Sequence, residues 1–392
     1  MVKHKIHATK DRVQSEGLKA YRDNGYKGTV CICTGGGKTR VGVLAAMECT
    51  GNVLIITPST TLRDKEWVDE FVKWTGSVPD NVTIECIQTA YTRIFRKYQL
   101  VIIDEIHRSF GPEYRHIYQI DRERTLGLTA TPPLHNEEGM ELLAEYCPIV
   151  YELDINKGVE LGIVSPFKVY NLRLSFTPSE RAKYAKFDKM FSEARNALMN
   201  YIKLNRLEVD LFQLADKASK DSEHSMNRYA RQFWQFMQLR KHACYNASKK
   251  LDLCKQIVDK YPDNTWIIFC KSKKFAENVA KHIGDKAKFY HSGQSAKKRK
   301  SIIDSYNNGE FKVLCSVDAL KEGFNLPIIE HGITASGDSV YLNQAQSIGR
   351  TIRLVEGKNS KFINLYVGNS QEEKWVKKRT EGFDPDWVTT IP

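Results

Sequence analysis

A glycine-rich segment and an acidic pair are the residues in this sequence with the clearest chemical potential. Gly35-Gly36-Gly37-Lys38-Thr39 follows the apolar run 29–33, and a second apolar run leads into Asp104-Glu105-Ile106-His107. A glycine-rich turn before a helix leaves backbone N–H groups free to bind phosphate oxygens, and the helix dipole adds positive potential. Together and in this order, the two segments indicate a site that hydrolyses a nucleoside triphosphate.

Each residue type in these segments suits one part of that chemistry. Lys38 would reach the β- and γ-phosphates, Thr39 and Asp104 would bind Mg²⁺, and Glu105 would polarise the attacking water. Ile32 stands where the general phosphate-loop pattern has glycine. Alone, a glycine-rich turn is usually only a tight turn and an acidic pair only a solvated loop. Their combination is what predicts the site.

Two late arginines could complete such a site from a second lobe. Arg350 and Arg353 lie three residues apart in the segment 346–353, so on a helix they would share one face. Guanidinium groups are always charged and bind phosphate oxygens with a planar fork. An arginine finger contributes about 10³–10⁵ in rate, so we expect turnover to be coupled to a lobe motion. Without the other motifs, this pattern would describe an ordinary basic helix.

The elements that must position these residues form two α/β series. Short apolar runs alternate with amphipathic stretches, and such unbroken runs predict parallel strands covered on both faces, with ligands at their carboxyl ends. The first series comprises residues 29–33, 53–57, 82–87, 100–104 and 125–130. The second comprises residues 167–174, 265–269, 288–290, 312–315, 331–335 and 361–366. The predicted fold class is α/β, with two parallel-sheet lobes.

A helical hairpin is expected within the second lobe, over residues 178–248. Thr177-Pro178-Ser179-Glu180 has a capping residue, a proline at the first helical position and an acid at the third. The polar stretch 217–223 reads as the turn between its helices. Its basic residues either solvate the outer face or contact nucleic acid, and both readings stay open. They are Lys183, Lys186, Lys189, Arg195, Arg228, Arg231, Arg240 and Lys241.

Composition narrows the range of partners. The chain has 392 residues, 41% hydrophobic and 27% charged, which is ordinary for a globular protein of two or three domains. Its formal net charge of +12 suits a polyanion such as nucleic acid. No run approaches eighteen apolar residues, so we expect no membrane contact and a cytoplasmic protein. The nine cysteines form no CxxC pair, so we expect neither zinc nor an iron–sulfur cluster.

These motifs, taken in order, resemble those of superfamily 2 helicases over nearly the whole chain. The adenine-reading Q motif is similar to residues 10–14, motif I to 34–39, motif Ia to 53–62 and the next nucleic-acid contact to 88–89. Residues 104–107 resemble motif II in its DExH form, and 128–132 resemble motif III. Motifs IV, V and VI resemble residues 268–272, 319–327 and 346–353.

The resemblance implies two RecA-like lobes and a set of site residues. It implies lobe 1 at residues 1–153, lobe 2 at 154–366 with an insertion at about 178–248, and a tail at 367–392. Lys38, Asp104, Glu105, His107, Arg350 and Arg353 would be catalytic. ATP would be held by Gln14, Thr34, Gly35, Gly36, Gly37, Lys38, Thr39, Arg40, Gly323 and Gln346, with Gln14 on the adenine. Mg²⁺ would be bound by Thr39 and Asp104. His107, Thr129 and Thr131 would couple the nucleotide to the nucleic-acid track.

Two positions depart from the family pattern. Motif V has Lys321 and Asn325 where acidic residues are common, and motif VI has Ser347 where a basic residue is common. The resemblance implies that Glu322 and Gly323 would lie near the ribose and the metal. The departures concern this ribose contact and the fine coupling, and they do not affect the expected ATPase activity.

Within the superfamily, residues 158–167 and 174–177 are similar to the XPB-like branch, and the compact length resembles the phage UvsW type, which remodels branched DNA. The resemblance implies an ATP-dependent DNA helicase or translocase acting on forks or junctions in bacterial or phage-infected cytoplasm. We expect a monomer. An RNA-remodelling enzyme of the DExH type, a motor subunit of a restriction system and an inactive binding scaffold are the alternatives, with RNA the less favoured partner.

Overall fold

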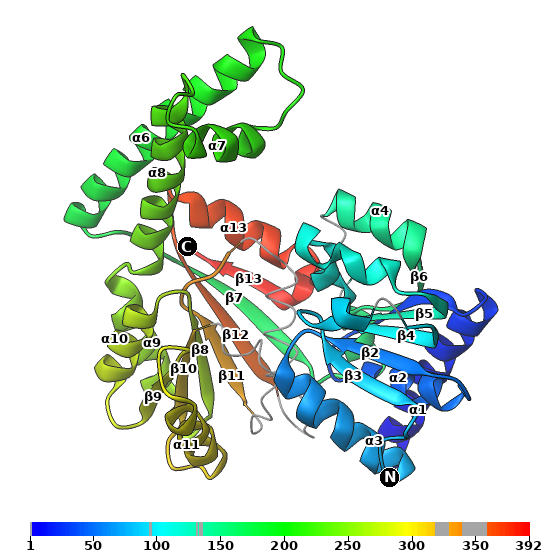
Figure 1. Ribbon diagram of the computed structural model, residues 1–392. Coiled ribbons are helices and arrows are strands. Elements are labelled where there is room, and N and C mark those ends of the chain that lie inside the picture. Colours follow the sequence, from blue (N-terminus) through cyan, green and yellow to red (C-terminus); the bar gives the residue numbers. More distant parts are fainter. Residues whose placement is uncertain (1, 94–95, 131, 133–135, 318–328, 339–358) are drawn as a thin grey trace.

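Two parallel β-sheets lie side by side and organise the chain (Figure 1). The computed structural model describes residues 2–93, 96–130, 132, 136–317, 329–338 and 359–392. Every strand pair in both sheets is parallel, so the predicted α/β class with two parallel-sheet lobes is confirmed.

The first sheet carries the predicted phosphate loop and acidic pair. Its strand order is β3-β2-β4-β5-β1-β6. The strands are β1 (Lys27–Ile32), β2 (Val53–Thr57), β3 (Val82–Cys86), β4 (Tyr98–Asp104), β5 (Arg122–Thr129) and β6 (Ile149–Leu153). Its helices are α1 (Val2–Asp23), α2 (Lys38–Met47), α3 (Trp67–Thr75) and α4 (Glu137–Tyr146), with the π-helix η1 (Leu62–Glu66) leading into α3. The order places β1 and β4 on either side of β5, so the loops after β1 and β4 meet at one edge of the sheet.

The second sheet has the order β13-β7-β12-β11-β8-β10-β9. Its strands are β7 (Phe167–Leu174), β8 (Trp266–Cys270), β9 (Ala287–Tyr290), β10 (Val313–Val317), β11 (His331–Thr334), β12 (Ser360–Val367) and β13 (Val388–Ile391). The helices that follow its strands or precede them are α9 (Lys249–Lys260), α10 (Lys273–Ile283), α11 (Ala296–Asn307) and α13 (Gln371–Thr380). The helix α5 (Ile155–Glu160) connects the two sheets.

The end of the chain differs from the separate tail that the sequence suggested. Residues 367–392 contain α13 and β13, and β13 pairs with β7 in parallel, so they extend the second sheet. The strand β13 is mostly exposed and lacks the unbroken apolar run by which the other strands were predicted. The lobe division itself, at residues 153 and 366, stays a prediction.

The inserted segment forms an arm of helices that projects away from both sheets, at the top of Figure 1. It comprises α6 (Pro178–Leu204), α7 (Leu211–Lys220) and α8 (Asn227–Tyr245), so the predicted two-helix hairpin contains a third helix. The expected turn at 217–223 was wrong in its first half, because residues 217–220 are the last turn of α7. The predicted capping box is present: the Thr177 side chain accepts from Glu180 N, and the Glu180 carboxylate accepts from Thr177 N.

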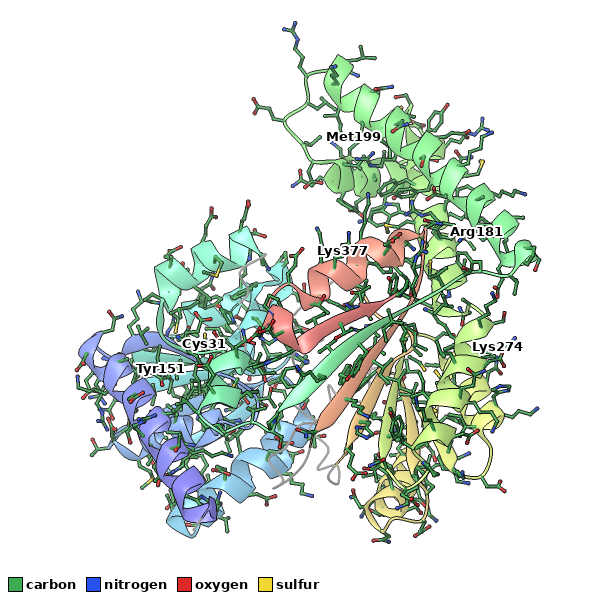
Figure 2. All side chains as sticks on the ribbon, turned by 180° about the vertical axis from the view of Figure 1, so that it is seen from behind. Cys31, Tyr151, Arg181, Met199, Lys274 and Lys377 are labelled. Atoms are coloured by element: carbon green, nitrogen blue, oxygen red, sulfur yellow. The ribbon has the colours of Figure 1, made fainter. Side chains whose placement is uncertain are left out.

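A small apolar core holds the arm together. Ala194 and Leu198 of α6 pack with Ala215 of α7 and with Ala230 and Phe233 of α8. These side chains are all buried, so the aromatic Phe233 belongs to the core and is not free to stack on a base. Met199, which Figure 2 labels far out on the arm, is exposed.

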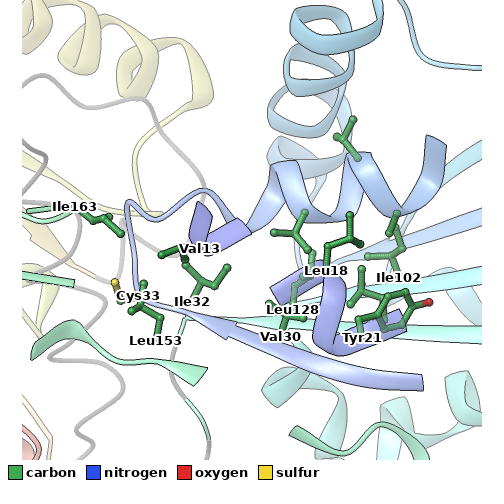
Figure 3. Close-up of a cluster of buried hydrophobic side chains, with 14 of the residues drawn as sticks. Val13, Leu18, Tyr21, Val30, Ile32, Cys33, Ile102, Leu128, Leu153 and Ile163 are labelled. Atoms are coloured by element: carbon green, nitrogen blue, oxygen red, sulfur yellow. The ribbon is translucent and has the colours of Figure 1, made fainter. Parts of the chain in front are cut away.

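One hydrophobic cluster crosses from the first sheet to the second. Val13 and Ile32 share it with Phe167, Val169 and Phe383. Figure 3 shows the part of this cluster around the phosphate-loop strand, where Val13 and Ile32 lie near one another. The loop after β1 therefore starts from a buried, well-packed base.

A buried ion pair anchors α13 to α9. Lys250 Nζ lies 2.8 and 2.9 Å from the two carboxylate oxygens of Glu372, and neither side chain is exposed. Glu372 Oε2 also accepts a hydrogen bond of 2.9 Å from Val367 N. Loss of either partner would leave an uncompensated buried charge, so the contact ties α13 to α9.

Candidate nucleotide site

The loop between β1 and α2 has the backbone of a phosphate cradle. Gly35 and Gly37 have φ values of 92° and 88°, which side chains rarely adopt. A Cβ at Gly36 would clash with the Ile32 side chain, and one at Gly37 would clash with the Gln14 amide. Glycine is therefore required for the path of the loop, and α2 begins directly after it at Lys38. Thr34 lies at the start of this loop.

Gln14 of α1 lies against this loop and is almost fully buried. Its Nε2 donates a 2.9 Å hydrogen bond to Gly36 O, and its Oε1 accepts one of 2.8 Å from Arg40 Nη1. Arg40 also pairs with Asp11 and lies 3.9 Å over the ring of Trp74. The structure thus brings Gln14, which was predicted to contact the adenine, and Arg40, which was predicted to help hold ATP, together beside the loop.

Lys38 joins the loop to the acidic pair. Its Nζ pairs with Glu105 Oε1 and lies 3.9 Å from Asp104 Oδ1. These groups come from the first turn of α2 and from the end of β4, which the parallel sheet aligns at one edge. The Lys38 ammonium group therefore lies close to both carboxylates, and its predicted contact with the phosphates stays a prediction.

Burial and neighbouring charges shift the pKa values of the two carboxyl groups in opposite directions. Burial raises the pKa of Asp104 and outweighs the opposing effect of Lys38. Burial also acts to raise the pKa of Glu105, but Lys38 and His107 outweigh it and lower the pKa to about 2. Glu105 adopts a left-handed backbone with φ 49°, which is uncommon outside glycine and is found where a functional side chain must be aimed. Glu105 is therefore ionised and held in one direction beside Lys38.

Trp67 is a site residue that the sequence analysis missed. The first residue of α3, it is fully buried, and its Nε1 donates a 3.1 Å hydrogen bond to Asp104 Oδ2. The other carboxylate oxygen, Oδ1, accepts a 3.0 Å hydrogen bond from Glu105 N. The signal available in the sequence was that a buried tryptophan N–H needs a polar partner, but nothing there identified Asp104 as that partner.

His107 connects the acidic pair to the end of β5. Its Nδ1 lies 3.1 Å from Thr129 Oγ1 and 3.5 Å from Glu105 Oε2. Burial lowers the pKa of His107 to about 4, so the ring is neutral near neutral pH. A neutral ring can either donate to or accept from the Thr129 hydroxyl, so the contact can form without a change in charge.

The donor set fits Mg²⁺. Mg²⁺ prefers oxygen ligands and is usually held by one or two protein groups together with substrate phosphates and water. Asp104 offers a fixed carboxylate, and Thr39 follows Lys38 in the first turn of α2. Within the described part of the chain, no group of three or more His, Cys, Asp or Glu could hold a metal ion, so a protein-only cage is not what the site offers.

Four of the expected site residues lie outside the described residues. These are Gly323, Gln346, Arg350 and Arg353. Glu322 and Thr131, for which roles were also expected, lie outside the described residues as well. All nine cysteines are described; they are buried and free. In the described part of the chain, every helix is too short or too polar to span a membrane.

Family comparisons match the two halves of the chain separately. The family model described as "Type III restriction enzyme, res subunit" matches residues 3–134, and that described as "Helicase conserved C-terminal domain" matches residues 249–355. The first match contains the phosphate loop and the acidic pair.

Several curated proteins are similar over most of the chain. The DNA 3'-5' translocase XPB2 of Sulfurisphaera tokodaii is 24% identical over 94% of this chain and 84% of its own length. The DNA 3'-5' helicase XPB of Mycobacterium tuberculosis is 22% identical, with coverage of 91% and 60%. A putative DNA 3'-5' helicase Rad25 of Haloarcula marismortui is 23% identical, with coverage of 88% and 50%. The chain thus spans only half to three fifths of the last two relatives.

Among solved structures, the Hef helicase domain of Pyrococcus furiosus has a similar fold. The TM-score is 0.56 at 16% sequence identity, and the match covers 94% of this chain and 96% of that one. At this identity the likeness concerns the fold alone.

Proposed function

Because the chain is a superfamily 2 helicase, and so an ATP-dependent helicase-type enzyme, we propose that it is a DNA translocase that remodels forked or branched DNA. The observation that carries the ATPase part is the meeting of Lys38 with Glu105 and Asp104 at the end of the phosphate loop. In this proposal, ATP hydrolysis drives movement along DNA, and this movement causes branch migration or fork regression.

Each side chain at the loop has a task in this proposal. The loop N–H groups and Lys38 bind the phosphates of ATP, and Lys38 leaves Glu105 when the phosphates arrive. Glu105, ionised and aimed by its backbone, then orients the attacking water and accepts its proton. Thr39 and Asp104 would hold Mg²⁺, which supplies charge neutralisation at the phosphates.

The remaining predicted residues complete the proposed site. Gln14 and Arg40 would face the adenine side, and the His107–Thr129 contact would transmit the state of the nucleotide. Arg350 and Arg353 would sense the γ-phosphate from the second lobe, with Gly323 and Gln346 near the nucleotide.

DNA as the partner is supported by three features. The relatives that cover most of the chain are named as DNA translocases or helicases, with 3'-5' polarity. The formal net charge is +12. Exposed basic side chains follow the arm: Lys183, Lys186, Lys189, Arg195, Arg228 and Arg231. By contrast, Arg240 pairs with Asp188 and Gln371 and is partly buried, so it serves the structure of the arm.

Two specific similarities favour alternative functions: action on RNA, and a role as the motor subunit of a restriction system. A DEAD-box ATP-dependent RNA helicase of Oryza sativa is 32% identical over 30% of this chain, which favours RNA as the alternative. The match of residues 3–134 to the restriction-enzyme family favours a motor subunit as another. Motor motifs contact the phosphodiester backbone, so they do not by themselves discriminate between DNA and RNA.

A nucleic-acid panel tests the proposal. ATP turnover is measured with single strands, forks and four-way junctions, each made in DNA and in RNA. We expect the strongest stimulation by branched DNA. Equal or stronger stimulation by the RNA set would overturn the DNA assignment, and no stimulation by any of them would overturn the motor function.

A further inference from the structure

Asp104 is held at both carboxylate oxygens, and one of the two holders comes from another element. Glu105 N binds Oδ1 at 3.0 Å from within the same loop, whereas Trp67 Nε1 binds Oδ2 at 3.1 Å from the first residue of α3. Lys38 Nζ is 3.9 Å from Oδ1, beyond hydrogen-bond distance. Within the part of the chain that the structure describes, the indole N–H is therefore the side-chain hydrogen bond that fixes the rotation of this carboxylate.

The Trp67 ring is itself locked in place. It is fully buried, and a Cβ added to Gly42 of α2 would lie 2.5 Å from its Cη2 atom, so the ring rests directly on the helix that follows the phosphate loop. It also lies near Phe71, with ring centroids 6.3 Å apart. A ring that packing already holds in one conformation can orient a neighbouring group without a further loss of conformational entropy.

The segment before Trp67 leads back to β2. The π-helix η1 (Leu62–Glu66) runs into α3 without a break, and Arg63 N donates to Ser59 O in the stretch that resembles motif Ia. π-helical turns are rare and recur at functional sites. One continuous helical element thus links the residues after β2 to the Asp104 carboxylate, which it contacts through Trp67.

From this geometry we propose that Trp67 is a positioning residue: its N–H sets the orientation in which Asp104 meets Mg²⁺, and it ties the residues after β2 to that orientation. The proposal rests on the proposed ATPase function. Groups that orient a metal ligand from behind typically change metal affinity or activity by about 10–100-fold when removed.

The test is Trp67→Phe, which keeps a ring on Gly42 and removes the N–H. Mn²⁺ binding in the presence of ADP is followed by electron paramagnetic resonance, and ATP turnover is titrated with Mg²⁺ with and without single-stranded DNA. We expect the affinity for Mn²⁺ to fall about tenfold, the Mg²⁺ needed for half-maximal turnover to rise similarly, and the stimulation by DNA to shrink.

Trp266→Phe is the matched control. Trp266 is also fully buried, and it donates its indole N–H to Tyr261 O at 3.3 Å in the second sheet. The Trp266→Phe protein should lose about as much stability as Trp67→Phe and should keep the wild-type affinity for Mn²⁺. Wild-type Mn²⁺ affinity and Mg²⁺ dependence in a folded Trp67→Phe protein, or an equal shift in both variants, would overturn the proposal. Absence of ATP turnover in the wild-type protein would instead overturn the proposed function.

Discussion

His107 Nδ1 lies 3.1 Å from the Thr129 hydroxyl and joins the loop after β4 to the end of β5. In the first sheet these strands are neighbours, with Asp104 opposite Leu128. The loop with the acidic pair is therefore connected to the segment 128–132, which resembles motif III and begins at the end of β5. We propose that this contact passes the state of the nucleotide toward the nucleic acid.

Thr129→Val should uncouple the two activities. It preserves the shape of the side chain and removes only the hydroxyl that His107 contacts. We expect DNA-stimulated ATP turnover to stay within about threefold of wild type and strand separation per ATP to fall by about tenfold or more, since a hydrogen bond of this kind contributes about 1 kcal/mol and its loss leaves a buried partner unsatisfied. The measurement compares both rates on the same forked DNA.

Thr125→Val provides the comparison for that experiment. Thr125 lies on the same strand, and its hydroxyl accepts from Arg122 Nε at 2.7 Å, away from the loop. It should leave the ratio of unwinding to ATP turnover unchanged. If Thr129→Val leaves that ratio unchanged as well, the contact has no coupling role.

Glu105→Gln should retain ATP and stop its hydrolysis. The substitution keeps the size of the side chain and leaves Asp104 and Lys38 in place, but it removes the group that accepts the proton of water. We expect turnover to fall by about 10²–10⁴. Filter-retention of radiolabelled ATP measures binding, and single-turnover quenching measures hydrolysis.

Lys38→Ala gives the contrasting result in the same assays, with ATP binding itself lost. A Glu105→Gln protein that hydrolyses ATP at more than a tenth of the wild-type rate would show that another group is the base.

Removing three exposed charges from α6 should weaken DNA binding. Lys183, Lys186 and Lys189 are all exposed on the arm. Changing them together to Ala should lower the affinity for duplex DNA and reduce the slope of log affinity against log salt by as much as about 2.7, the value for three phosphate contacts. Fluorescence anisotropy at several salt concentrations measures both quantities.

An equal charge change elsewhere separates contact from net charge. Lys260, Lys281 and Lys286 are exposed on or beside the helices of the second sheet. If their replacement by Ala reduces the slope as much as the α6 variant does, the arm makes no special contact, and its basic side chains serve only to solvate it.

Lys250→Met should strongly destabilise the protein. It leaves Glu372 buried without its partner, although Val367 N still donates to the carboxylate. Breaking a buried ion pair in this way costs about 3–5 kcal/mol. Chemical denaturation should show this loss, whereas Lys255→Met, which removes an exposed pair with Asp259, should change stability by less than about 1 kcal/mol. Equal effects would contradict the role assigned to the buried pair.

The sequence predicted those parts of the fold that leave a local pattern. The apolar runs of the central strands and the capping box at Thr177 are such patterns, and both were confirmed. It missed β6 and β13, which are mostly not buried and whose place at a sheet edge depends on a partner far away in the chain. It also missed α7, which lies within a stretch rich in polar residues.

The candidate site divides in the same way. Lys38 and Glu105 lie 67 residues apart, yet each belongs to a recognisable segment, so their meeting could be expected from sequence. Trp67 and Asp104 lie 37 residues apart, and nothing in the segment around Trp67 specifies which polar group its N–H reaches. That pairing depends on the order of β2 and β4 in the sheet and on the packing of α3 against Gly42, which only the three-dimensional structure supplies.

The most direct test of the account follows a synthetic four-way DNA junction by gel or fluorescence energy transfer, with wild-type protein and with Lys38→Ala. Wild-type protein should convert the junction to its branch-migrated products only when ATP and Mg²⁺ are present, and Lys38→Ala should leave the junction intact. A wild-type protein that hydrolyses ATP on the junction and never moves its branch point, or a Lys38→Ala protein that moves it equally well, would contradict the claim that ATP hydrolysis at this loop drives the remodelling of DNA.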